Sequence, residues 1–211
     1  MRHRQGDMLY ETDGEGNEYQ TMITNADNKA VEASIINKNR KAHETMTNIT
    51  LAQSIIKGSN TDFVIEKATK LGVAQITPIK TERTIAAVSD KKLNRYEKLM
   101  LDAIKSSTRI RLPSLSKPIL FNKLLETTDN YDLTLITWEA EKTNRLTNVT
   151  TKERVNNILL IIGPDGGFTE SEIAEATRSG ANSFTLGPRR LRAETAALAA
   201  LSLVLYKLKE M

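Results

Sequence analysis

Two glycine-proline segments in the last quarter of the chain hold the residue types best suited to binding a ligand. The first glycine loop, residues 162–168, reads Ile162-Gly163-Pro164-Asp165-Gly166-Gly167-Phe168. The second glycine loop, residues 186–195, reads Leu186-Gly187-Pro188-Arg189-Arg190-Leu191-Arg192-Ala193-Glu194-Thr195. A glycine-rich turn between a parallel strand and a helix lets the backbone approach a ligand closely, which is how α/β sheets bind ligands. A tight turn that needs glycine geometry is the alternative explanation for the first loop.

The second glycine loop also concentrates positive charge. Arg189, Arg190 and Arg192 place three guanidinium groups within four residues, which predicts contact with an anion. Ordinary surface arginines are the alternative. Neither loop matches the phosphate-binding P-loop, because no lysine follows the glycines, and neither matches the GxGxxG dinucleotide pattern.

Alternating strand and helix patterns position these loops. The apolar run 158–162 predicts a central strand buried on both faces, and Thr169 with Glu172 predicts a capping box at the start of a helix. From residue 49 the order of elements predicts an α/β domain with a mostly parallel sheet. The expected strands are 49–54, 74–79, 133–138, 157–162 and 183–186. The expected helices are 62–71, 90–107, 169–180 and 193–209.

The N-terminal part follows a different pattern. Residues 8–12 and 18–24 flank a glycine-containing hairpin turn, and residues 30–36 offer a third strand. Residues 37–47 are polar and predict a linker. We therefore expect a small β domain over residues 1–44 and the α/β domain over residues 45–211.

Composition narrows the classes of function. The chain has no cysteine and only two histidines, His3 and His43, so no metal site is expected. No stretch is long and apolar enough for a membrane helix, and residues 1–7 lack the apolar core of a signal peptide, so we expect a cytoplasmic protein. Residues 45–211 carry 24 basic and 18 acidic side chains, which suits RNA as a partner. A solvated, lysine-rich surface is the alternative.

The two loops, at this spacing, closely resemble those of the RsmE family. Its members are bacterial S-adenosylmethionine-dependent methyltransferases of the SPOUT superfamily, which modify N3 of a uridine in small-subunit (16S) ribosomal RNA. The resemblance runs from about Gly6 to the C-terminus. Further matches lie in residues 66–73, 76–78 and 82–84.

This resemblance implies a fold and an assembly. It implies a SPOUT-type methyltransferase domain with a deep trefoil knot, preceded by a small PUA-like β-barrel that helps to hold RNA. It also implies a homodimer, which suits the expected last helix because that helix is apolar nearly all round.

The resemblance also implies which residues bind S-adenosylmethionine. One wall of the site would be made by Ile162, Gly163 and Gly166. The other wall would be made by Leu186, Gly187, Leu191 and Arg192.

The chain departs from the family pattern at three places. Asp165 replaces the usual glutamate of the first glycine loop. The usual Glu-Gln-Ser-x-Arg run reads Lys105-Ser106-Ser107-Thr108-Arg109. The family usually begins some 30 residues earlier, so we expect the barrel to be incomplete.

Methylation of uridine N3 needs aligned reactants and a means of handling the N3 proton. We assign Arg192 to stabilising or positioning the uridine anion, and Arg83 and Arg109 to phosphate contacts. Glu194 is a candidate base, and the alternative is a first-turn glutamate favoured by the helix dipole. Two other hypotheses are a non-catalytic RNA- or cofactor-binding member of the same fold, and an α/β enzyme for another nucleotide.

Overall fold

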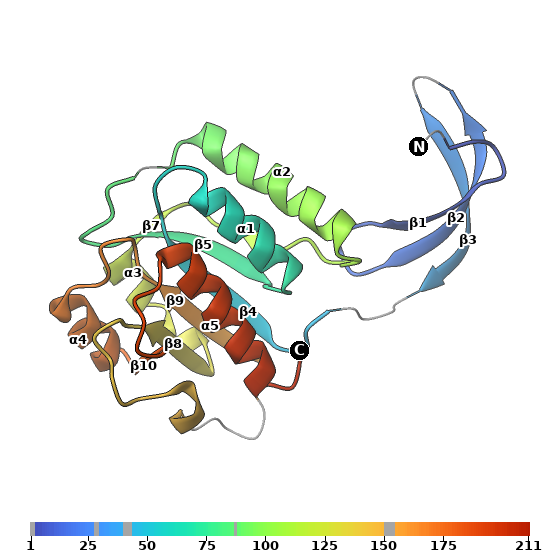
Figure 1. The fold of residues 1–211 in the computed structure, drawn as a ribbon. Helices are drawn as coiled ribbons and strands as arrows, with labels where there is room; N and C mark the ends of the chain where they lie inside the picture. The colour runs from blue at the N-terminus through green and yellow to red at the C-terminus, as the bar shows by residue number, and fades with distance from the viewer. Residues whose placement is uncertain (1–2, 28–29, 40–43, 87, 150–154) are drawn as a thin grey trace.

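A computed structural model describes residues 3–27, 30–39, 44–86, 88–149 and 155–211, which form two separate β-sheets (Figure 1). The smaller sheet is antiparallel with the strand order β1-β2-β3, and the larger sheet has the order β10-β8-β9-β4-β5-β6, with β7 beside β5. Every strand pair of the larger sheet is parallel, so the prediction of an α/β fold with a parallel sheet is confirmed. The strands are β1 Met8–Thr12, β2 Glu18–Ala26, β3 Val31–Asn39, β4 Asn48–Ser54, β5 Gln75–Lys80, β6 Ser114–Leu115, β7 Ile119–Leu120, β8 Leu133–Thr137, β9 Asn157–Ile162 and β10 Asn182–Phe184.

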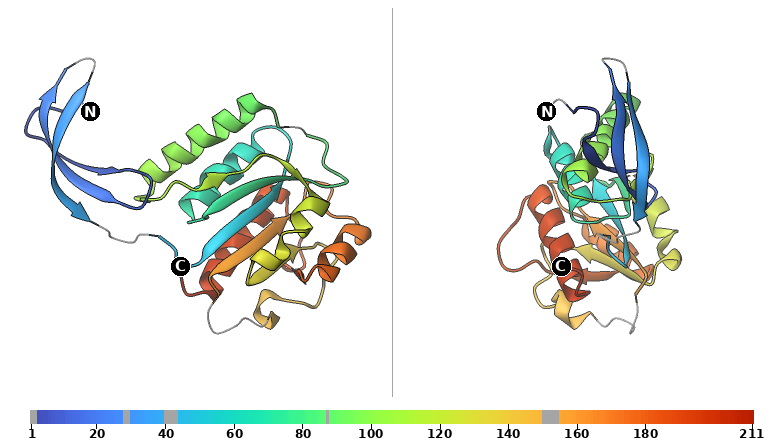
Figure 2. Two further views of the ribbon diagram at one scale, coloured as in Figure 1. Left: turned by 180° about the vertical axis from the view of Figure 1, so that it is seen from behind. Right: turned by 90° about the vertical axis from the view of Figure 1, so that its right-hand side faces the viewer.

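Helices cover both faces of the larger sheet. Helices α1, α2 and α5 pack on one face, and α3 and α4 pack on the other (Figures 1 and 2). Their bounds are α1 Asn60–Lys70, α2 Asp90–Ser106, α3 Phe121–Leu125, α4 Glu170–Arg178 and α5 Ala193–Lys207, with short 3₁₀ turns at Thr128–Asn130 and Leu146–Asn148.

Strand β9 lies near the centre of this sheet and is buried on both faces. The side chains of Ile158, Leu160 and Ile162 pack in the core beneath α1, α2 and α5. The intervening Leu159 and Ile161 pack in the core beneath α3 and α4. This alternation explains why the run is apolar without interruption, and it confirms the predicted central strand.

The helix that follows the first glycine loop begins as the sequence predicts. Thr169 is its N-cap, and the Thr169 hydroxyl accepts a 3.2 Å hydrogen bond from the backbone N–H of Glu172. In return the Glu172 carboxylate accepts a 2.9 Å hydrogen bond from the N–H of Thr169. These reciprocal bonds form the predicted capping box and fix the direction in which the chain leaves the loop.

The sequence prediction missed three short elements, β6, β7 and α3. The two strands have only two residues each, which is too short to show a hydrophobic period. In the N-terminal part, β3 continues to Asn39, so the predicted linker begins too early because pairing with β2 extends the strand. Residues 40–43 of that expected linker lie outside the described residues.

The smaller sheet meets the rest of the chain through the turn between β1 and β2. The N–H of Gly16 donates to the carbonyl of Ile110 at 2.9 Å, and the N–H of Leu112 donates to the carbonyl of Gly14 at 2.9 Å. Both partners follow the C-terminal end of α2, where Figure 2 shows the hairpin approaching the larger sheet. The described N-terminal part is thus a three-stranded antiparallel sheet docked by its turn.

Candidate active site

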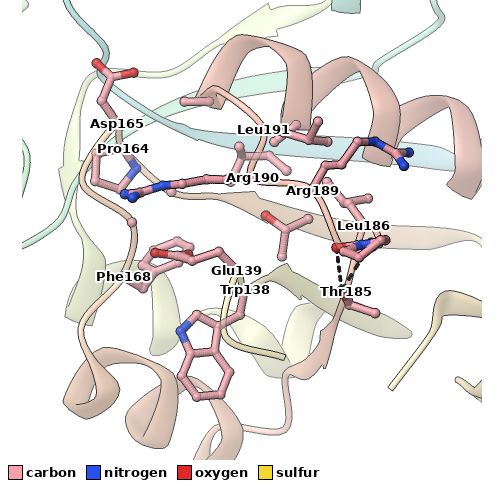
Figure 3. A pocket seen from close by; sticks show the side chains of 18 residues that line it. Trp138, Glu139, Pro164, Asp165, Phe168, Thr185, Leu186, Arg189, Arg190 and Leu191 are labelled. Carbon is pink, nitrogen blue, oxygen red and sulfur yellow. Dashed lines mark hydrogen bonds between the residues drawn. The ribbon is translucent and has the colours of Figure 1, made fainter. Parts of the chain in front are cut away.

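Two cavities adjoin the first glycine loop, and we call them the first and second pockets. The first pocket lies at the carboxyl ends of three adjacent strands, β10, β8 and β9 (Figure 3). It is a cavity of about 330 Å³, and the loops that follow these strands supply its walls. Its lining residues are Thr137, Trp138, Glu139, Ile162, Gly163, Pro164, Asp165, Gly167, Phe168, Thr185, Leu186, Gly187, Pro188, Arg189, Arg190, Leu191, Ala193 and Ala196. Crevices at the carboxyl ends of parallel strands are the usual ligand sites of open α/β sheets.

The first glycine loop packs closely against neighbouring side chains at two of its glycines. Gly167 has φ +69°, its N–H donates to the carbonyl of Pro164 at 2.9 Å, and a Cβ there would collide with the carboxylate of Glu139. A Cβ on Gly163 would lie 2.9 Å from the ring of Phe168. The loop can therefore present its backbone to a ligand at short range.

The second glycine loop is held by the residue that precedes it. The hydroxyl of Thr185 accepts a 3.2 Å hydrogen bond from the N–H of Gly187, whose φ is +106° (Figure 3). The N–H of Thr185 donates to the carbonyl of Asn144 at 2.8 Å. The second glycine loop is thus tied to the segment that follows β8.

Glu141 organises that segment. Its carboxylate accepts 3.0 Å hydrogen bonds from the backbone N–H groups of Thr143 and Asn144, and a 3.1 Å bond from the hydroxyl of Ser183. The bond from Asn144, together with the others, lowers the pKa of Glu141 from 4.5 to about 2. The segment after β8, whose residues Trp138 and Glu139 line the pocket, is therefore fixed by an ionised carboxylate.

Three arginines make the second glycine loop strongly cationic. Arg189, Arg190 and Arg192 are exposed, and within the described part of the chain none of their side chains forms a hydrogen bond or ion pair. Arg190 reaches across the first pocket toward Pro164, whereas Arg189 points away (Figure 3). This unneutralised charge favours an anionic partner.

Most of the predicted cofactor residues come together in the first pocket. Ile162, Gly163, Leu186, Gly187 and Leu191 line it.

The other predicted residues of the two loops lie elsewhere. Gly166 lines a different cavity, the second pocket, and Arg192 is the N-cap of α5, beside the first pocket but outside its lining. Glu194 lies in the first turn of α5 and lines neither pocket. One of its carboxylate oxygens is buried, with no hydrogen-bond partner in the described structure.

The second pocket lies on the other side of the first glycine loop, with a cavity volume of about 510 Å³. It is lined by Ile55, Lys57, Glu82, Arg83, Ile85, Ala86, Pro164, Asp165 and Gly166. The predicted phosphate-contact residue Arg83 is here, exposed, and its guanidinium donates to the carbonyl of Gly166 at 2.8 Å.

Arg109 does not lie at this surface, which corrects its predicted role as a phosphate contact. Only 5% of the residue is exposed, and its guanidinium is paired with the carboxylate of Glu44 at 2.6 Å. It also donates to the carbonyls of Thr69 and Val73 at 2.7 and 3.0 Å. A guanidinium satisfied inside the protein cannot reach an RNA phosphate, so Arg109 is a structural residue.

Sequence reasoning also missed several residues of both pockets. Thr137, Trp138 and Glu139 line the first pocket, and Lys57 lines the second. All four lie at or just beyond the carboxyl end of a predicted parallel strand, which was the available signal.

Two features are absent among the described residues. No helix there is both long and apolar enough to cross a bilayer. Nor do three or more His, Asp or Glu side chains cluster there in a way that could hold a metal ion.

Comparison with known proteins gives consistent matches. A family model for the RNA methyltransferase domain matches residues 43–205. Ribosomal RNA small subunit methyltransferase E from Mesomycoplasma hyopneumoniae is 36% identical over 79% of this chain and 73% of the relative. Its namesake from Bacillus subtilis is 27% identical over 98% of this chain and 84% of the relative.

A solved structure gives the same result. The fold superimposes with a TM-score of 0.90 on ribosomal RNA small subunit methyltransferase E from Neisseria gonorrhoeae, crystallised with S-adenosyl methionine. That protein is 30% identical, and the match covers 97% of this chain and 84% of the other. These matches confirm the resemblance that the two glycine loops indicate. The chain belongs to the RNA methyltransferase family that includes ribosomal RNA small subunit methyltransferase E.

Proposed function

We propose that this chain transfers a methyl group from S-adenosylmethionine to N3 of a uridine in 16S ribosomal RNA. The observation that carries the proposal is the first pocket, where the loops after β8, β9 and β10 converge and glycine backbone forms two walls. The relatives' names supply the reaction and the RNA. Because the substrate is ribosomal RNA, the chain acts where small subunits assemble, in the cytoplasm.

The first pocket suits S-adenosylmethionine in shape and charge. Gly163, Gly167 and Gly187 allow close backbone approach, and apolar side chains such as Leu186 and Leu191 complete the walls. Glu139 supplies negative charge that complements a sulfonium group. When bound, S-adenosylmethionine supplies an electrophilic methyl carbon on cationic sulfur.

The chain's own residues then hold the acceptor in line with the donor. Arg189 and Arg190 line the pocket and Arg192 lies beside it, all with unneutralised charge, so they bind RNA phosphates, and Arg192 stabilises the negative charge that develops on uridine. Glu194 lines neither pocket, so we assign it the alternative role of a first-turn acidic residue at the positive end of α5.

We also propose that the chain is knotted around this pocket. The proposal is supported by the bridge between Arg145 and Thr185 and by the hydrogen bond from the Asn144 side chain to the Ser183 carbonyl, which hold the segment after β8 beside β10 and the residue that follows it. Helix α5 then returns to pack on α1. A crystal structure traced through residues 130–195 tests this, and an unthreaded path would contradict it.

Two features support a homodimer with an accessory RNA-binding sheet. The outer face of α5 exposes Leu203 and Tyr206, which are 44% and 74% accessible, and a second copy would cover them. The antiparallel sheet β1–β3 of the 1–44 region is the PUA-like part, proposed to hold RNA beside the α/β domain of residues 45–211.

Deletion of the gene tests the proposed function. Nucleosides of 16S ribosomal RNA are then compared by mass spectrometry with and without a plasmid copy. We expect the deletion to remove one 3-methyluridine and the plasmid copy to restore it. An unchanged nucleoside profile would contradict the proposal.

A further inference from the structure

The second pocket adjoins the first across two residues of the first glycine loop. Pro164 and Asp165 line both cavities. The strand order explains this, because β9 lies between β8 and β4 and its loop therefore borders both the crevice above β10 and β8 and the crevice above β4 and β5. A group held in the second pocket beside these two shared residues would lie next to the first pocket.

The rim of the second pocket is suited to a nucleotide. Lys57 is exposed and, in the described residues, its ammonium group has no hydrogen bond or ion pair. Arg83 uses one nitrogen for the carbonyl of Gly166 and remains exposed. Two such cations within one cavity are suited to bind the phosphates on either side of a nucleotide.

The same cavity also offers apolar surface. Both Ile55 and Ile85 line the cavity. The side chain of Ile55 is buried, whereas Ile85 is 79% accessible. Enzymes that modify a base commonly flip it into a pocket and pack it between apolar or aromatic side chains. A cavity of about 510 Å³ falls within the usual range for small-molecule sites, roughly 300–1,000 Å³.

Asp165 is the carboxylate best placed to serve both pockets. Glu139 lines only the first pocket, and Glu82 lines only the second, where its carboxylate accepts a bond from the hydroxyl of Thr169. Asp165 lines both, is exposed, and makes no hydrogen bond or ion pair with the residues that the structure describes. In Figure 3 its side chain points away from Arg190. Its oxygens are therefore available to a group that enters the second pocket.

We propose that the second pocket receives the acceptor pyrimidine nucleotide of the RNA and that Asp165 takes the N3 proton. This inference rests on the proposed function. The N3–H bond breaks and its proton moves to the Asp165 carboxylate, while the N3 electron pair forms the new bond to the methyl carbon. The bond from that carbon to sulfur breaks, and its electrons remain on sulfur, so the sulfonium charge is cancelled and S-adenosylhomocysteine is the second product.

Asp165→Asn tests the proton acceptor, because it keeps the side-chain shape and removes the base. The assay uses S-adenosylmethionine and small ribosomal subunits that lack this methyl group. We expect the rate of methyl transfer to fall by about 100-fold or more, the usual contribution of a general base, while calorimetry gives unchanged affinity for S-adenosylmethionine. Asp165→Glu keeps a carboxylate and should retain most of the rate.

Two further variants complete the experiment. Lys57→Gln should raise the KM for the ribosomal subunit with little change in the affinity for S-adenosylmethionine. Asp129→Asn, which removes an exposed carboxylate that lines neither pocket, should match the wild type.

The other possible results distinguish a failure of this inference from a failure of the proposed function. Equal transfer by the wild type and Asp165→Asn would overturn the inference alone. Loss of S-adenosylmethionine binding in Asp165→Asn would also overturn it, because Asp165 would then belong to the donor site. No transfer by the wild type would contradict the proposed function, and the inference with it.

Discussion

The guanidinium group of Arg83 donates a 2.8 Å hydrogen bond to the carbonyl oxygen of Gly166. The bond joins the loop after β5 to the first glycine loop, whose residues Pro164 and Asp165 line both pockets. Arg83 remains exposed.

Arg83→Gln should weaken RNA binding and make it less sensitive to salt. The amide can still donate to Gly166, but one phosphate contact is lost, so the slope of log affinity against log salt should fall by about 1. Filter binding of 16S ribosomal RNA across a salt series measures this. Lys123→Gln is the control, because Lys123 is exposed and paired with Glu126. An unchanged slope in Arg83→Gln would remove Arg83 from the RNA-binding surface.

Gly167→Ala should abolish the affinity for S-adenosylmethionine in a chain that still folds. Alanine is strained at φ +69°, and its Cβ would displace the Glu139 carboxylate that lines the first pocket. Gly180→Ala is the matched control, since φ is +84° there and a Cβ would meet nothing within 4 Å. Calorimetric titration should show binding in the control only. Wild-type affinity in Gly167→Ala would contradict the binding of S-adenosylmethionine in the first pocket.

Arg109→Met should destabilise the protein without a specific effect on RNA. Removing one member of a buried ion pair leaves Glu44 uncompensated and costs roughly 3–5 kcal/mol. Glu44→Gln should show a cost of similar size, and the double variant should lose less than the sum of the two. Urea denaturation measures each. RNA affinity reduced in proportion to one phosphate contact, at unchanged stability, would restore the predicted role of Arg109.

Local features of this fold can be predicted from the sequence, whereas the burial of Arg109 could not be. The apolar run of β9 and the capping box of Thr169 and Glu172 depend on neighbouring residues, so they were predicted correctly. The pairing of Arg109 with Glu44 spans 65 positions, and no local pattern encodes it. The five predicted cofactor residues that line the first pocket belong to conspicuous glycine loops. Trp138 and Glu139 were missed because their place in the pocket depends on the order of strands in the sheet.

Glu141 should make stability depend on pH below about 5. The pKa of Glu141 is lowered from 4.5 to about 2 in the folded chain. The ionised carboxylate therefore stabilises the fold at pH values above 4.5, the pKa that it has in the unfolded chain. That contribution is lost as the pH falls from about 4.5 toward 2. Urea denaturation should therefore show Glu141→Gln less stable than the wild type at pH 7 and nearly equal to it near pH 2.

An exposed glutamate provides the control for this measurement. Glu126→Gln removes only a surface pair with Lys123, so it should change stability by less than about 1 kcal/mol. A stability difference for Glu141→Gln that stays constant from pH 7 to pH 2 would show that the Glu141 carboxylate does not anchor the loop.

Leu203→Asp should convert the proposed dimer to a monomer. The change places a charge in the exposed apolar face of α5, where the second copy is expected to pack. Leu101→Asp on α2 is the control, because Leu101 is similarly accessible, at 41%, and lies on another helix. Sedimentation equilibrium distinguishes the two masses. A monomeric wild type, or a Leu203→Asp variant that stays dimeric, would contradict this interface.

Methylation of uridine N3 in 16S ribosomal RNA by this chain can be measured in a purified system. The most direct measurement incubates the purified protein with methyl-labelled S-adenosylmethionine and small ribosomal subunits that lack this modification. Nuclease digestion and mass spectrometry then locate the label. We predict one labelled 3-methyluridine per 16S molecule. Label on another base, or none at all, would contradict the account.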